Sequence, residues 1–122
     1  MYIVLAVFVG GGFGSLARYG VSRLVTGNFE NINPLATLIS NTISTILLGV
    51  VLYLLAGRIE MQPSWRAFII IGFCGGFSTF STFSYEILEL FKTANYWYAA
   101  GNILISMILG VGTLYVLSRI VQ

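Results

Sequence analysis

The chain has 122 residues, of which 57% are hydrophobic, 15% aromatic and only 8% charged, and its formal net charge is +2. An average soluble domain has about 25% charged residues. So few charged side chains cannot cover the surface of a water-soluble globule of this size. The apolar content excludes a disordered chain, and the scattered basic residues exclude a nucleic-acid-binding protein. The composition therefore indicates an integral membrane protein.

Several residue types that carry enzyme chemistry are absent from the sequence. It has no His and no Asp, and its one cysteine is Cys74. A His/Cys metal centre, a His-dependent catalytic triad and a disulfide within the chain are therefore excluded. Glu86 and Glu89 are the two carboxylates close together in sequence, and we expect them to occupy a solvated helix end. The chain is therefore not expected to be an enzyme.

Four apolar segments have about the 20 residues that a helix needs to cross the hydrocarbon core. In chain order they cover residues 1–24, 34–56, 67–91 and 96–117, with short polar connectors between them. The sequence thus predicts an all-α integral membrane fold, with residues 1–122 forming one four-helix domain. In the first segment, Gly10 and Gly14 form a small-xxx-small pair, which favours a tight helix crossing.

Polar side chains recur along the second, third and fourth predicted helices. Such groups in apolar segments mark either a pathway or contacts between helices, and both interpretations stay open at this point. The first stripe is Thr37, Asn41, Ser44 and Thr45; the second is the run from Ser78 to Tyr85; the third is Asn102, Ser106, Gly110 and Thr113.

The third segment also contains two adjacent glycines. Gly75 and Gly76 precede Ser78 and Thr79, and this combination predicts a helix broken in mid-membrane. A break frees backbone carbonyls, which need partners. Near a dimer axis, carbonyls from two copies are expected to surround a cation such as Na⁺.

The basic residues are divided equally between the two sides of the predicted bundle. Because Lys/Arg asymmetry sets orientation, an equal division predicts insertion in both directions and hence a dual-topology, antiparallel homodimer. The alternative is a single orientation set by another determinant. Arg58, Arg66 and Arg119 lie on one side, and Arg18, Arg23 and Lys92 lie at or towards the other.

The groups available along a pathway are neutral. No acidic residue lies in the middle of a predicted helix, which argues against a cation pump. The Asn41 amide and the hydroxyls of Ser81 and Thr82 are hydrogen-bond donors, and the ring edges of Phe80 and Phe83 are electropositive. Neutral donors suit a permeating anion because they replace its hydration without holding it tightly.

Three stretches of the sequence resemble the Fluc (CrcB) family of fluoride channels. They are GGFGSLARY at residues 11–19, NPLATLISN at 33–41 and GFCGGFSTFSTFSYE at 72–86, and the resemblance extends over the whole chain. It implies a fluoride-selective channel of the cell (inner or plasma) membrane. Such a channel exports cytoplasmic fluoride by passive electrodiffusion and confers fluoride resistance. It also implies a dual-topology homodimer with two antiparallel pores and a structural Na⁺ at its centre.

The resemblance also assigns roles to individual residues. Arg18 matches a family arginine, with a vestibule or structural role. Two residues depart from the family pattern. Some members have Tyr at the position of Asn102, and many have Thr at the position of Ser78. The implied Na⁺ ligands are the backbone carbonyls of Gly75 and Ser78, and the implied fluoride pore is lined by Asn41, Phe80, Phe83, Ser81, Thr82 and Ser106.

Two alternatives of other classes remain open. A small multidrug-type exporter also has four short spans, but it would require a carboxylate in the first span, and residues 1–24 contain none. In a non-transporting scaffold subunit, the hydroxyl stripes would only join helices.

Overall fold

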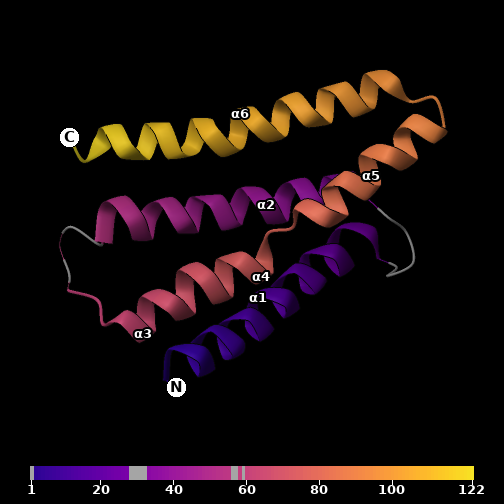
Figure 1. The fold of residues 1–122 in the computed structure, drawn as a ribbon. Helices are drawn as coiled ribbons and strands as arrows, with labels where there is room; N and C mark the ends of the chain where they lie inside the picture. The colour runs from indigo at the N-terminus through magenta and orange to yellow at the C-terminus, as the bar shows by residue number, and fades with distance from the viewer. Residues whose placement is uncertain (1, 28–32, 56–57, 59) are drawn as a thin grey trace.

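The protein is described by a computed structural model, which covers residues 2–27, 33–55, 58 and 60–122. Its helices form four segments that are long and apolar enough to cross a membrane, lying side by side as Figure 1 shows. The part of the chain that the structure describes contains no strand. The all-helical, four-span fold is therefore confirmed. The spans are Tyr2–Thr26, Pro34–Leu55, Pro63–Lys92 and Tyr96–Ile120.

The four spans differ in how regular they are. The first and fourth are the single helices α1 (Tyr2–Thr26) and α6 (Tyr96–Ile120), and the second is α2 (Pro34–Gly49) continued by the π-helical segment η1 (Val50–Leu55). The third span begins before the predicted residue 67, because Pro63 is pre-organised for a first helical position. Residues 1 and 56, which were predicted to be helical, lie outside the described residues. The third span comprises α3 (Pro63–Arg66), π-helical η2 (Ala67–Cys74), α4 (Gly75–Phe77) and α5 (Phe80–Lys92).

Local signals set the end of α1 and the start of α2. Gly27 follows α1 with a φ of 65°, which favours glycine, and its N–H donates to the Arg23 carbonyl at 2.9 Å. The Asn33 side chain caps α2 by accepting a hydrogen bond from the Leu35 N–H at 2.9 Å. Pro34 takes the first helical position, where its missing N–H has no consequence.

Helix α1 packs most closely against η2 and α4. Gly10 and Gly14 are buried, and a Cβ added to either would collide with backbone atoms, the Phe68 carbonyl oxygen at Gly10 and the Phe73 carbonyl oxygen at Gly14. The backbone of α1 is therefore in direct contact with the backbone of η2, without intervening side chains. This confirms the tight crossing predicted from the glycine pair.

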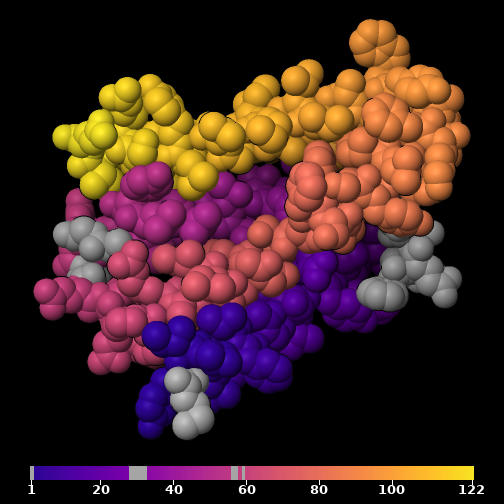
Figure 2. Space-filling model, viewed as in Figure 1, coloured from indigo at the N-terminus to yellow at the C-terminus, as the bar shows by residue number. Residues whose placement is uncertain are grey.

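Helices α1 and α6 form opposite edges of the molecule (Figure 2). Large apolar side chains are exposed on both, including Val4 and Phe8 on α1 and Leu104, Ile108 and Val111 on α6. Such surfaces are suited to a lipid environment. The buried core is correspondingly small and consists largely of small and hydroxyl-bearing residues.

The third span is interrupted between α4 and α5. Ser78 and Thr79 have extended backbones, with φ/ψ of −82°/155° and −152°/123°, and α5 turns away from α4 towards α6 (Figure 1). The interruption follows the glycine pair instead of including it, since Gly75 and Gly76 are helical in α4. The helix continues through the two glycines because Gly76, which has no side chain, can pack directly against the Gly11 backbone of α1 while remaining helical.

Candidate functional site

The interruption of the third span is held by a side chain from α2. The Thr79 N–H donates to Asn41 Oδ1 at 2.8 Å, and Asn41 Nδ2 donates to the Thr79 carbonyl at 3.3 Å. One amide side chain thus satisfies both polar groups of an extended residue, as a neighbouring strand would. Asn41, a predicted pore residue, therefore lies directly at the interruption.

Backbone carbonyls at the end of α4 lose their helical partners here, and those of Gly75 and Ser78 are among them. In a continuous helix the Thr79 N–H would bond to the Gly75 carbonyl, and the Thr82 N–H to the Ser78 carbonyl. The Thr79 N–H is instead bonded to Asn41, and the Thr82 N–H donates to Thr79 Oγ1 at 3.3 Å. These are the two carbonyls that the resemblance assigned to Na⁺. The structure leaves both without their i+4 donors.

The end of η2 is fixed by two serines. Ser44 Oγ and Ser78 Oγ both donate to the Cys74 carbonyl, at 2.9 and 2.8 Å. Ser44 belongs to the same stripe of α2 as Asn41, so this stripe faces the third span. Thr45 is the exception, because its hydroxyl donates back to the Asn41 carbonyl of its own helix at 2.8 Å.

The phenylalanines and serine assigned to the pore lie on α5. The ring centroids of Phe80 and Phe83 are 6.2 Å apart, and the Phe80 side chain is 79% exposed. Ser81 is also exposed, whereas Thr82 is half-buried beside Thr79. One chain therefore brings Asn41 and Thr82 to the interruption but leaves Phe80 and Ser81 on its surface.

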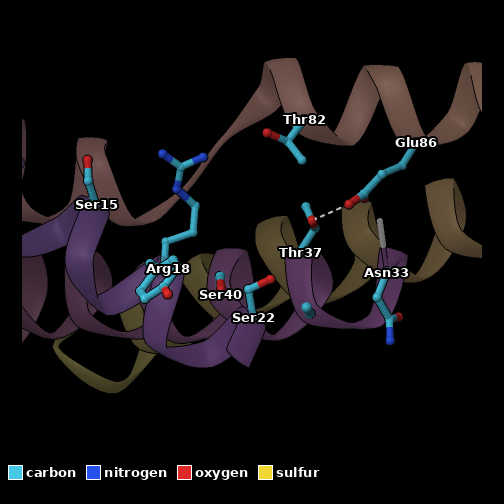
Figure 3. A pocket seen from close by; sticks show the side chains of 10 residues that line it. Ser15, Arg18, Ser22, Asn33, Thr37, Ser40, Thr82 and Glu86 are labelled. Carbon is cyan, nitrogen blue, oxygen red and sulfur yellow. Dashed lines mark hydrogen bonds between the residues drawn. The ribbon is translucent and has the colours of Figure 1, made fainter. Parts of the chain in front are cut away.

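A cavity of about 330 Å³ lies between α1, α2 and α5. Figure 3 shows polar side chains from all three helices around it. Arg18 is half-buried here, and its Nε has no hydrogen-bond partner among the described residues. Arg18 thus lines a cavity between helices. The lining residues are Ser15, Arg18, Tyr19, Ser22, Asn33, Ala36, Thr37, Ser40, Thr82 and Glu86.

The prediction of a solvated helix end is wrong for Glu86. Glu86 is 2% exposed, Thr37 Oγ1 donates to its Oε1 at 2.6 Å, and its Oε2 has no partner in the described part of the chain. Glu89 is on the outer side of α5 and pairs with Lys92 at 3.1 Å. Glu86 is buried because its face of α5 packs against α2, which sequence analysis did not foresee.

A signal for this pair was present in the sequence. Thr37 precedes Asn41 by one helical turn, and Glu86 follows Thr82 by one turn. Once Asn41 is placed next to the Thr79–Thr82 turn, antiparallel packing of α2 and α5 brings Thr37 towards Glu86. The pair was not predicted because Glu86 was assigned to a solvated helix end, outside the polar run that ends at Tyr85.

Ser106 lies apart from this group. Its hydroxyl donates to Asn102 Oδ1 at 3.1 Å, so the two residues form a pair within α6. Within the residues that the structure describes, no hydrogen bond joins this pair to Asn41 or Thr82. A single chain therefore does not assemble all the predicted pore residues into one site.

Comparison with known proteins identifies the family. The family model for CrcB-like protein, Camphor Resistance (CrcB), matches residues 5–117. A protein named fluoride-specific ion channel FluC from Pyrococcus horikoshii is 42% identical over 83% of this chain and 80% of its own length.

Two further relatives agree with this match. The protein named fluoride-specific ion channel FluC 1 from Yersinia pseudotuberculosis serotype I is 40% identical, over 85% of this chain and 81% of its own length. The protein named fluoride-specific ion channel FluC from Thermococcus kodakarensis is also 40% identical, over 93% of this chain and 90% of its own length. The resemblance noted in the sequence is thus confirmed, and the chain belongs to the CrcB family.

Proposed function

We propose that the chain is a fluoride-selective ion channel of the cell membrane that exports cytoplasmic fluoride by passive electrodiffusion. The observation that carries this proposal is the 40–42% identity, over most of the chain, to relatives named fluoride-specific ion channels. The four apolar spans agree with a multi-pass membrane protein. The function is transport and not catalysis.

The chemistry of the site supports an anion as the permeating species. The cavity of Figure 3 is lined by the Arg18 guanidinium and several hydroxyl groups, together with the Glu86 carboxyl group that Thr37 holds, so an anion that enters on the Arg18 side meets donors and a positive charge. At the interruption, Asn41 uses one of its two amide hydrogens for the Thr79 carbonyl, and the second, which has no partner among the described residues, can contact fluoride. The electropositive ring edges of Phe80 and Phe83 follow on α5.

The direction of transport follows from acid–base chemistry. Fluoride enters cells as its neutral weak acid and ionises in the less acidic cytoplasm. The membrane potential then drives the trapped anion outward through any selective leak. No proton gradient is required.

An antiparallel, dual-topology homodimer is part of this proposal. Phe80 and Ser81 are exposed, and the Asn102–Ser106 pair is separate from Asn41, so the pore residues of one chain require a second copy to become a lined path. The equal division of basic residues supports opposite orientations of the two copies. A tag on the C-terminus should be accessible from both membrane faces, and access from one face alone would contradict dual topology.

A structural Na⁺ at the dimer centre fits the residues present. The carbonyls of Gly75 and Ser78 have lost their i+4 donors, and oxygen ligands are those that hard cations prefer. Gly75 is exposed, and an added Cβ there would meet no atom of the described residues within 4 Å, so a second copy has room to approach. We place the interruption in mid-membrane, because Ser78 and Thr79 lie near the middle of the third span. When bound, the ion would supply positive charge that attracts carbonyl oxygens of both copies.

Fluoride release from proteoliposomes tests the function. With valinomycin and a potassium gradient, the wild-type protein should release fluoride rapidly, as measured with a fluoride electrode. The double variant Phe80→Ile, Phe83→Ile should be slower by roughly tenfold or more, because it removes two electropositive ring edges. The matched control is Phe8→Ile, an exposed α1 residue, which should conduct normally.

The other outcomes identify the alternatives. Release that depends on a proton gradient would indicate a multidrug-type exporter, and no release from well-folded protein would indicate a scaffold subunit. Either result would overturn the proposed function.

A further inference from the structure

The close crossing of α1 and the third span contains a mismatch in residue spacing. Gly10 and Gly14 are four residues apart on α1, which is about one turn of an α-helix, so they lie on one face. The backbone carbonyls that meet them, those of Phe68 and Phe73, are five residues apart. Two residues with this spacing on a regular α-helix lie on faces that differ by about 140°. A regular α-helix in the third span therefore could not meet both glycines.

The π-helical segment η2 removes this mismatch, because a π-helical turn is closed by a hydrogen bond from i to i+5 and contains one residue more than an α-helical turn. A Cβ added at Gly10 would collide with the Phe68 carbonyl oxygen and would lie 3.1 Å from the Phe73 amide nitrogen, two groups five residues apart. At Gly14 the corresponding groups are the Phe73 carbonyl oxygen and the Phe77 amide nitrogen, which are four residues apart. The wide turn therefore lies between Phe68 and Phe73.

One extra residue accounts for the whole of η2. Within Ala67–Cys74, the pairs separated by five residues are 67 and 72, 68 and 73, and 69 and 74. Ile70 and Ile71 lie inside all three pairs, so removal of either would leave pairs separated by four, as in an α-helix. Ile71 is 61% exposed, so its side chain contributes little to the core. Ile71 is therefore the residue that the packing of the third span can lose.

The register of η2 matters because the interruption follows it directly. The Thr79 N–H, six residues after Phe73, donates to Asn41 Oδ1 on α2 at 2.8 Å. If all residues were retained in a continuous α-helix with Phe68 still at Gly10, α4 would rotate by about 100° around the axis of the span. Thr79 would then be directed away from Asn41. The π-helical turn thus allows the contact with α1 and the contact with α2 to form together.

We propose that η2 is a register adapter, a positioning segment that takes up one extra residue so that the third span meets Gly10 and Gly14 while Thr79 still meets Asn41. Glycine at both positions is part of the adapter, because the backbone of η2 is held directly by the backbone of α1. The adapter holds the residues at the interruption in place, and the efflux measurements that test it rest on the proposed function.

Deletion of Ile71 is the direct test. The third span should then be α-helical from Pro63 to Phe77 and keep its contacts with both glycines. We expect a melting midpoint in detergent within a few degrees of wild type, and fluoride efflux from proteoliposomes within about threefold of wild type.

The matched control is deletion of Ile108, an isoleucine of α6 that is 68% exposed. Because α6 is a regular α-helix, this deletion turns all later residues by about 100° and moves Leu114 and Leu117 away from Gly49, against which they pack. Efflux should fall by roughly tenfold or more, and the melting midpoint should fall clearly.

Two further measurements report the register itself. Insertion of one alanine after Ile71 gives the segment a second extra residue, and it should be as harmful as deletion of Ile108. Gly10→Ala and Gly14→Ala should each lower the melting midpoint of the Ile71-deleted protein as much as that of the wild type, because the same carbonyls still meet both glycines. A smaller loss for either substitution would show that the register has shifted.

The proposal would be overturned if deletion of Ile71 prevented folding or were as harmful as deletion of Ile108. It would also be overturned if the alanine insertion were tolerated as well as the deletion, since η2 would then accept any length. Absence of efflux in the wild type would instead refute the proposed function, and the melting midpoints would still decide on the adapter.

Discussion

Asn41→Asp is expected to reduce fluoride efflux by roughly a hundredfold or more. Aspartate keeps the Oδ1 that accepts the Thr79 N–H at 2.8 Å. It places a second oxygen where Nδ2 now lies, 3.3 Å from the Thr79 carbonyl, so an attraction becomes a repulsion between two acceptors. It also adds a negative charge beside the proposed anion path. Electrode-monitored efflux from proteoliposomes measures the effect.

Thr42→Val is the matched control on the same helix. The Thr42 hydroxyl donates to the Leu38 carbonyl of its own helix at 2.7 Å, and among the residues that the structure describes it has no hydrogen bond to the third span. Its loss should leave efflux within about twofold of wild type, since such a backbone hydrogen bond within one helix contributes little. Equal rates for Asn41→Asp and the wild type would show that Asn41 has no part in conduction.

Gly14→Ala is expected to destabilise the fold by roughly 1–3 kcal/mol or more, since it overpacks a close contact. The added methyl group would collide with the Phe73 carbonyl oxygen and would lie 2.8 Å from the Phe77 amide nitrogen. Both are backbone atoms, which cannot rotate away as a side chain does. The expected result is a lower midpoint of thermal unfolding in detergent and a smaller yield of monodisperse protein.

Gly12→Ala makes the same chemical change on the same helix without the contact. Gly12 is exposed, and within the described part of the chain a Cβ there would meet no atom within 4 Å. Alanine favours a helix over glycine by about 1 kcal/mol, so this variant should be as stable as the wild type or slightly more stable. Equal melting midpoints for the two variants would show that α1 does not pack closely at Gly14.

Much of the fold could be predicted from local features of the sequence. Segment length and hydropathy are sufficient for the four spans, and the spacing of Gly10 and Gly14 is sufficient for the close crossing of α1, because both properties belong to one helix at a time. The Asn33–Pro34 start of α2 is equally local. In the site, Asn41 and Thr82 could be chosen as pore candidates because they are polar groups in apolar segments.

Other features depend on which helices pack together. The burial of Glu86 was missed because its partner, Thr37, lies on another helix, 49 residues earlier in the chain. The hydrogen bond from Ser106 to Asn102 could not be predicted either. Sequence spacing shows that the two residues share a face of α6, but not which of them donates to the other.

The sequence by itself determined that this is a four-span membrane protein of the CrcB family with neutral polar stripes, because composition, periodicity and motifs are properties of the linear sequence and do not depend on which helices pack together. Only the tertiary structure decided that the third span is interrupted at Ser78 and Thr79 and not at the glycine pair. The physical reason is hydrogen bonding. Without water, extended backbone is tolerated only where another group satisfies it, and that group is the Asn41 side chain, 38 residues away on α2.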